Sequence, residues 1–262
     1  FLDGYGAMLA PMGTVLPEGQ DRIEPEDAGA IRWCLRQRDG GGFIFINNFQ
    51  DHVHMPDREG ISIELETAKG KARIPHAGTF ALRSGAGVVL PFHLSLDGVE
   101  LAGATVQPLT RLSVNGQPVL VFFAHDGVQP ELVLEAGAIA DVRTNAGRCR
   151  LEGDVWIVRP AAGKEHSTEI SLRSGETVRV LVLTREEALH AYKFRLWGED
   201  RLVISGARLF CRNEQLVCRS PGVPRFGVSV FPAPDSSLAA SIGAAGASAA
   251  TAGAAGTGAT GA

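Results

Sequence analysis

The sequence predicts an all-β protein, built as two β-sandwich or barrel-like modules with one short helix between strands. Short runs of alternating apolar and polar residues recur along the chain, which is the pattern of half-buried strands. Turn-forming residues separate these runs at spacings of about 10 residues, as in sandwiches and barrels. Only one internal segment has a helical pattern with a capping residue, so an α/β fold is not expected.

Size and charge limit the classes of protein. The chain has 262 residues, of which 45% are hydrophobic and 21% charged, enough for one large or two small domains. The net charge of −4 offers no basic surface for nucleic acid and disfavours anionic membranes. No apolar run approaches the roughly 20 residues that span a bilayer. We therefore expect neither a nucleic-acid partner nor a membrane partner, and the compartment stays unassigned.

We expect four segments. Residues 1–27 form the end of a helix and a linker, residues 28–136 a first β domain, residues 137–235 a second β domain with a short helix, and residues 236–262 a disordered Ala/Gly/Ser/Thr tail. Phe1, Tyr5, Met8 and Leu9 recur at helical spacing, as in a helix remnant packed on a partner outside the chain. The start lacks methionine and lies within this pattern, so we expect a chain truncated at its N-terminus.

Turn chemistry supports the strand assignment. Strands are expected at residues 31–36, 43–46, 61–66 and 88–92, the last at an edge or bulge because it contains Pro91. Asn115-Gly116 predicts a type I′ hairpin between residues 112 and 123, since both residues tolerate positive φ. Further hairpins are expected at 149–158 and 170–182, and more strands at 202–204, 209–210 and 228–230. Thr184 and Glu187 predict a short helix, with Leu189 on its apolar face.

The four cysteines show no metal-binding spacing. Cys34 and Cys149 are interpreted as small core residues. Cys211 and Cys218 flank a predicted hairpin and form a disulfide only if its register places them opposite each other. The sequence leaves both states open.

Several motifs in order resemble family-35, β-galactosidase-like glycoside hydrolases, in the region after the catalytic barrel. The motifs are Tyr5-Gly6 with residues 9–12 (LAPM), residues 42–48 (GFIFINN), 90–93 (LPFH), 104–109 (ATVQPL), 183–188 (LTREEA) with Trp197-Gly198, and 231–234 (FPAP). The resemblance implies a non-catalytic β-domain fragment that supports a catalytic (β/α)8 barrel. It also implies, as partners, that barrel and C-terminal β domains of the same polypeptide, with carbohydrate bound by the parent enzyme.

The parent activity implied by this resemblance is retaining hydrolysis of terminal β-galactosides, which needs two carboxyl groups about 5–5.5 Å apart. No position here matches the family's catalytic motifs, so we assign no catalytic, cofactor-binding or metal residues and no cofactor. Glu64 and Glu66 lie on one face of a predicted strand and are interpreted as a solvated surface. We expect this chain alone to be inactive.

A cupin-like metalloprotein is one alternative. His52, Val53 and His54 form an HxH pattern, and Glu59 follows, which is half of a cupin metal signature. The flanking glycines of that signature are missing, and residues 55–58 favour a surface turn. His125-Asp126 matches a base with its orienting carboxylate but is more typical of a turn. The glycine-rich residues 84–87 join two strands and open no helix, so a phosphate site is not expected.

A stand-alone carbohydrate-binding module is the other alternative. Such modules stack exposed aromatic rings on sugars, and the candidates are Trp33, Trp156 and Trp197. Trp33 and Trp156 lie in strand patterns, where core packing is the more common role. Trp197 lies in a predicted loop and is the least constrained of the three.

Overall fold

The computed structural model describes residues 1–212, 215–220, 222–223 and 225–234. Strands dominate these residues, and the helices are α1 (Leu2–Leu9), α2 (Arg185–Leu189) and the 3-10 turns η1 (Gln20–Arg22) and η2 (Ala136–Ala138). The all-β prediction is therefore confirmed. The tail expected at 236–262 lies outside the described residues. No described helix has both the length and the apolar character needed to cross a membrane.

The chain divides into two compact units. Unit 1 contains residues 1–111 and 117–185, and unit 2 contains residues 112–116 and the described residues from 186 to 234. The boundary expected near residue 137 does not coincide with this division. Strands from both sides of residue 137 pair in the two large sheets of unit 1. The spacing of turns along the sequence does not show such pairing between distant strands.

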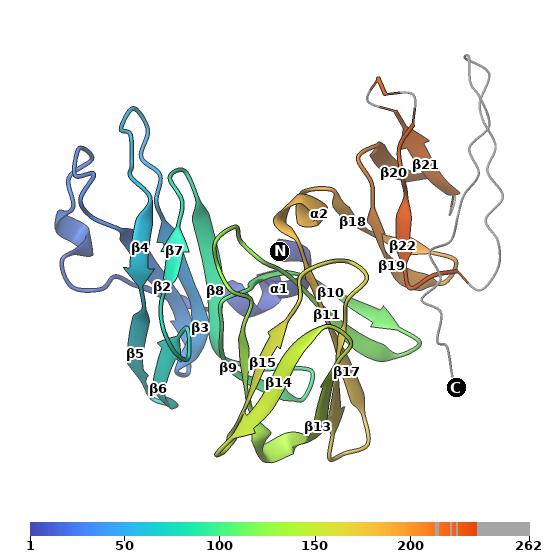
Figure 1. Cartoon of the computed structure of the whole chain (residues 1–262), viewed down its shortest axis with the longest axis horizontal. Coiled ribbons are helices and arrows are strands. Elements are labelled where there is room, and N and C mark those ends of the chain that lie inside the picture. The colour runs from blue at the N-terminus through green and yellow to red at the C-terminus, as the bar shows by residue number, and fades with distance from the viewer. Residues whose placement is uncertain (213–214, 221, 224, 235–262) are drawn as a thin grey trace. The chain divides into compact units, whose positions relative to one another are not determined.

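Two large sheets form unit 1 (Figure 1). The eight-stranded sheet has the order β1 (Gly13–Val15), β2 (Arg32–Arg38), β3 (Gly41–Asn47), β8 (Gly87–Leu96), β9 (Val99–Ala104), β12 (Leu132–Glu135), β15 (Val155–Pro160), β14 (Gly147–Glu152). The five-stranded sheet has the order β10 (Gln107–Val114), β11 (Gln117–Phe123), β17 (Thr177–Leu183), β16 (Thr168–Leu172), β13 (Ile139–Thr144). β11 and β17 are parallel, and the chain that connects them contributes β12, β14 and β15 to the eight-stranded sheet.

The main core of unit 1 unites side chains from both large sheets. Phe43, Leu101 and Leu134 come from the eight-stranded sheet, and Phe122 and Val180 come from the five-stranded sheet. All five are at most 2% exposed. Alternate residues of each strand point into this core, so the arrangement is a β-sandwich.

A second core lies on the opposite face of β3 and β8. Ile44 and Leu90 pack there with side chains from two short strand pairs, β4 (Arg58–Ile61) with β7 (Phe80–Leu82) and β5 (Ile63–Thr67) with β6 (Gly70–Ile74). These strand pairs lie beside β2 and β3 in Figure 1. β3 is thus buried on both faces, as expected for a strand with consecutive apolar residues.

Pro91 lies inside the eight-stranded sheet, not at its edge, because β8 pairs with β3 and β9. The nitrogen of Val89, two residues earlier, bonds Gln107 on the side away from β3, so the nitrogen of Pro91 faces that side too. Pairing of β8 with β9 begins only at Phe92, so proline leaves no ladder bond unmade. His93 has φ 45°, which re-aims the strand between the two cores.

Helix α1 packs on its own chain. Tyr5 is 1% exposed, and its ring centroid lies 6.2 Å from that of Phe43. The expected helix is confirmed, but the expectation of a packing partner outside the chain is wrong for Tyr5. Gly4 permits α1 to lie close to β10, since a Cβ there would lie 2.9 Å from the backbone nitrogen of Arg111.

Unit 2 holds a smaller core between two strand groups. β18 (Ala191–Leu196), β19 (Glu199–Ile204) and β22 (Ser229–Phe231) form one sheet, and β20 (Arg208–Arg212) pairs with β21 (Gln215–Arg219). Leu196, Val203 and Leu209 form its centre. Leu189 of α2 is 69% exposed, so its predicted place on an apolar face is wrong.

All four cysteines are free. In the β20–β21 pair, Cys211 lies opposite Leu216 and Cys218 lies opposite Leu209. The register therefore does not place the two cysteines opposite each other, and the disulfide left open by the sequence is not formed. Cys149 packs on the main core and donates its Sγ hydrogen to the carbonyl of Val142, 3.2 Å away.

The tip of the β10–β11 hairpin belongs to unit 2. Asn115 and Gly116 have φ of 50° and 75°, which confirms the type I′ turn. Two consecutive carboxylates of β19 accept backbone hydrogens from this tip. Asp200 bonds the nitrogen of Ser113 at 3.2 Å, and Glu199 bonds that of Asn115 at 3.3 Å.

Because β3 is buried on both faces, we expect Phe43→Ala to destabilise unit 1 strongly. We expect the free energy of unfolding in urea to fall by about 3–5 kcal/mol, because a buried ring is replaced by a cavity. Phe49→Ala is the matched control, since Phe49 is 53% exposed and follows the same strand. Equal losses in both variants would contradict the position of the main core.

Candidate functional site

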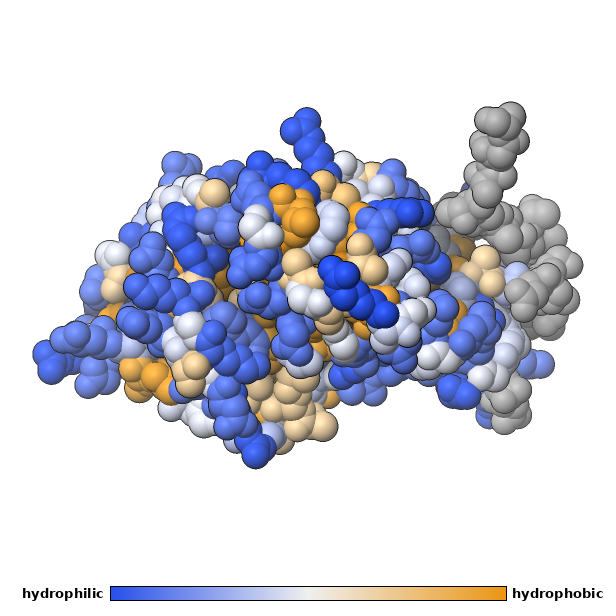
Figure 2. Space-filling model, turned by 90° about the horizontal axis from the view of Figure 1, so that it is seen from below, coloured by the Kyte–Doolittle hydropathy of each residue, from blue (hydrophilic) through white to orange (hydrophobic). Residues whose placement is uncertain are grey.

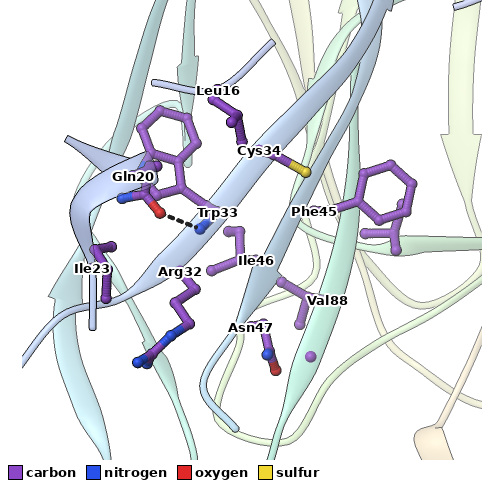
Figure 3. A pocket seen from close by; sticks show the side chains of 12 residues that line it. Leu16, Gln20, Ile23, Arg32, Trp33, Cys34, Phe45, Ile46, Asn47 and Val88 are labelled. Carbon is purple, nitrogen blue, oxygen red and sulfur yellow. Dashed lines mark hydrogen bonds between the residues drawn. The ribbon is translucent and has the colours of Figure 1, made fainter. Parts of the chain in front are cut away.

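An apolar groove opens between the segment 16–23 and strands β2, β3 and β8, all in unit 1 (Figure 3). Its volume is about 500 Å³. Apolar side chains make up most of its lining, namely Leu16, Ile23, Trp33, Cys34, Phe45, Ile46, Val88 and Val89. Volumes of 300–1,000 Å³ with mainly apolar walls are typical of small-molecule sites.

Gln20 fixes the segment that closes the groove. Its Oε1 accepts the backbone hydrogen of Trp33 at 2.9 Å, and its Nε2 donates to the carbonyl of Ile31 at 3.2 Å (Figure 3). β1 pairs with β2 only as far as the Val15–Leu35 pair. The carboxamide therefore continues the hydrogen-bond ladder of β2 where the backbone of β1 has ended.

Arg32 carries the charge of the groove. Its Nη2 donates to the carbonyls of Glu24 and Pro25 at 2.8 and 3.2 Å. Its Nη1 is buried without a hydrogen-bond partner. Within the described part of the chain, no carboxylate lies within ion-pair distance of this guanidinium, so its charge is balanced only by carbonyl dipoles.

No aspartate or glutamate lines the groove. Glu64 and Glu66 are exposed on β5, and Glu64 lies 3.5 Å from the Nε of Arg73. Both therefore belong to a solvated strand face. The groove does not hold the facing carboxyl pair that glycoside hydrolysis needs.

The histidines of the HxH pattern are at the surface. The imidazole of His52 is 92% exposed, in a turn with φ 62°, and lies 3.4 Å from the carboxylate of Asp51. His54 and Glu59 are exposed as well. Among residues with described positions, no three His, Cys, Asp or Glu side chains converge as metal ligands.

His125 and Asp126 have different partners. Asp126 lies 3.7 Å from Arg185, whereas the Nε2 of His125 lies 2.9 Å from the Oε1 of Gln107. The same Oε1 accepts the backbone hydrogen of Val89, so His125 is assigned as the donor. Burial, then the charge of Arg185, lowers the pKa of His125 to about 4, although Asp126 opposes the shift. His125 is thus a neutral link between β8, β10 and the loop after β11.

The three tryptophans lie in different surroundings. Trp33 packs partly on the second core and lines the groove, and Trp156 packs partly on the main core. Trp197, in unit 2, is 38% exposed, and its ring lies 5.6 Å from the guanidinium carbon of Arg201. The ring pairs found in the described residues do not include any of the exposed aromatic rings, which are Phe49, Trp197, Phe210 and Phe226.

Glu131 is a buried carboxylate that the sequence did not identify. Its side chain is 3% exposed, and Arg159 donates to its Oε2 through Nε and Nη2 at 2.9 and 2.7 Å. Its Oε1 accepts the backbone hydrogen of His76 at 2.7 Å. Glu131 therefore ties the loop after β6 to β12 and β15. A glutamate before an apolar strand looks, in sequence, like a solvated strand end.

The comparison with protein families identifies the class of β domain. The family described as "Beta-galactosidase, domain 2" matches residues 22–194. The chain belongs to this family, which confirms the resemblance drawn from the motifs. A search of curated proteins finds no match.

The Glu131 contacts predict that Glu131→Gln destabilises unit 1. We expect a loss of about 2 kcal/mol, because the amide cannot offer Arg159 a charged acceptor. Urea unfolding of the variant measures this loss. Glu66→Gln is the matched control on an exposed strand and should change stability by less than about 0.5 kcal/mol. A neutral effect of both substitutions would contradict the role of Glu131.

The lowered pKa of His125 predicts a pH-dependent stability. Between about pH 4 and 6.5 the unfolded chain binds more protons at this residue than the folded chain, so this contribution to stability rises with pH and is lost as pH falls. His125→Gln should flatten the stability profile across this window. His52→Gln, which replaces an imidazole that is 92% exposed, is the matched surface control. Identical profiles for wild type and His125→Gln would show that His125 is not buried.

Proposed function

We propose that this chain is a non-catalytic β region of a β-galactosidase-like glycoside hydrolase, which supports a catalytic (β/α)8 barrel that hydrolyses terminal β-galactosides. The observation that carries the proposal is the match of the domain-2 family across residues 22–194. The groove of unit 1, which no carboxylate lines, agrees with a supporting role. In this proposal both catalytic carboxyl groups belong to the barrel.

The surface of unit 1 offers dispersed contacts for such a barrel. Leu2, Leu16, Phe49 and Leu151 are each more than half exposed. Hydrophilic residues cover most of the face in Figure 2, and the apolar residues show there in small separate groups. Interfaces between domains of one polypeptide are more polar than obligate subunit interfaces, so this surface fits domain docking.

The proposal predicts that the purified chain does not hydrolyse nitrophenyl β-galactoside. The groove lacks the carboxyl pair that this hydrolysis requires, so the release of nitrophenol should equal that of a blank. Turnover that copurifies with the chain and is blocked by a galactose-like active-site inhibitor would overturn the proposal.

The supporting role is tested on the coding DNA upstream of Phe1. An open frame that encodes a barrel with two glutamates at strand ends would support the proposal. In that longer polypeptide, Phe43→Ala should lower the temperature at which galactosidase activity is lost, whereas Phe49→Ala should not. A stop codon and a nearby start before Phe1 would instead favour a stand-alone binding module.

A further inference from the structure

The apolar floor of the groove lies on the main-core face of the eight-stranded sheet. Cys34, Phe45 and Val89 are opposite one another on β2, β3 and β8, so their side chains share one face. Phe45 and Val89 pack partly on the main core, whereas Trp33 packs on the second core. Figure 3 shows the Cys34 side chain directed toward Phe45 and away from the Trp33 ring. An occupant on this face therefore contacts the row of Cys34, Phe45 and Val89, and not the Trp33 ring.

The next row on the same face leaves a hollow. Arg32, Asn47 and Gly87 are paired across β2, β3 and β8 in the same register. Gly87 has no side chain, and a Cβ there would meet no atom closer than 3.6 Å. Arg32 donates to the carbonyls of Glu24 and Pro25, and both ends of the Asn47 carboxamide are bonded to backbone groups. Because the polar side chains of this row are already bonded, the hollow above Gly87 suits an apolar group.

The segment that borders the groove is acidic. Gln20 and Ile23 line the groove, and the exposed carboxylates of Glu18, Asp21 and Glu24 alternate with them along the chain. These three carboxylates form the acidic rim. The bonds from Arg32 to the carbonyls at positions 24 and 25 hold the end of this segment at the main-core face. The acidic rim and the apolar floor therefore belong to one surface.

The excess charge of the protein lies in this segment. Residues 18–27 contain five carboxylates and one arginine, a net charge of −4, which equals the net charge of the whole chain. The rest of the chain is therefore electrically balanced. Within the described part of the chain, the rim carboxylates have no cationic partner. A cationic partner would gain their attraction without displacing an existing ion pair.

We propose that this groove docks a basic segment of a protein partner. One apolar side chain of that segment enters the hollow above Gly87 and lies against Phe45, and its lysine or arginine side chains face the acidic rim. Charge complementarity selects this occupant. Nucleic acids and anionic lipids have the same sign of charge as the rim, and a second copy of the chain brings the same net charge of −4.

Short synthetic peptides test both features of the partner. The first has a central leucine flanked by lysines, the second has the same leucine flanked by glutamates, and the third has a central alanine flanked by lysines. Isothermal titration calorimetry with the folded full chain in dilute salt gives the dissociation constants. We expect the lysine–leucine peptide to bind about tenfold more tightly than the glutamate–leucine peptide, from several surface ion pairs. It should bind about fivefold more tightly than the lysine–alanine peptide, from burial of its apolar side chain.

A rim variant locates the charged contact. The triple substitution Glu18→Gln, Asp21→Asn and Glu24→Gln should weaken the lysine–leucine peptide about tenfold. The rim side chains are exposed, so the fold should be kept, and circular dichroism checks this.

A matched control changes the net charge by the same amount elsewhere on unit 1. It combines Glu66→Gln, Glu100→Gln and Glu176→Gln, which also replace exposed carboxylates. This control should bind the lysine–leucine peptide as the wild type does, because the rim is intact.

Gly87→Leu locates the apolar contact. Its side chain fills the hollow and should remove the fivefold preference for leucine over alanine in the peptide. A Cβ at Gly87 would lie 3.6 Å from the carbonyl oxygen of Ile46, an ordinary contact, so the backbone accepts the substitution.

Each outcome either supports or overturns the proposal. Weaker binding to the rim variant but not to its control, with loss of the leucine preference in Gly87→Leu, supports it. Equal effects of the two triple variants, an unchanged leucine preference in Gly87→Leu, or no binding of the lysine–leucine peptide overturns it. A wild-type chain that sediments as a dimer, and a rim variant that sediments as a monomer, would show that a second copy occupies the groove, which also overturns it.

Discussion

The burial of β3 on both faces is the constraint on which the rest of unit 1 depends. Phe43 faces the main core and Ile44 faces the second core, and both are fully buried. A strand buried in this way must be apolar at consecutive positions and must have neighbours on both edges. β2 and β8 supply those edges. Close approach adds a further limit, since a Cβ on Gly42 would collide with the carbonyl oxygen of Arg36.

Polar side chains complete this framework where strands end or change partners. Gln20 extends the ladder of β2 beyond β1, and Gln107 meets the nitrogen of Val89 before β9 begins to pair with β8. The carboxylate of Glu131 accepts hydrogen bonds in the same way, and it joins the loop after β6 to β12 and β15. Each of these groups accepts a backbone hydrogen in a part-buried position, where an unpaired hydrogen would be costly.

Local signals predicted most strands but not their partners. Alternation located β2 and β5, and Asn115-Gly116 fixed both the position and the type of its turn. The parallel pairing of β11 with β17 depends on contacts between residues about 60 positions apart, which no local pattern encodes. For the same reason, turn spacing suggested a boundary near residue 137, although the strands on either side share sheets. Sequence gave even less of the groove. Trp33 was a candidate through its residue type, but Gln20 and Arg32 line the groove only because of their positions in the fold.

Unit 2 is built from two separate stretches of chain, and this has a consequence for dissecting the protein. A single cut near residue 185 would release β18 to β22 without the hairpin tip at 112–116. Glu199 and Asp200 would then lose the two amide hydrogens that they accept in the intact chain. A fragment that begins near residue 186 therefore lacks part of the structure of unit 2. An independent version of this unit would need the five tip residues grafted back, or new donors in their place.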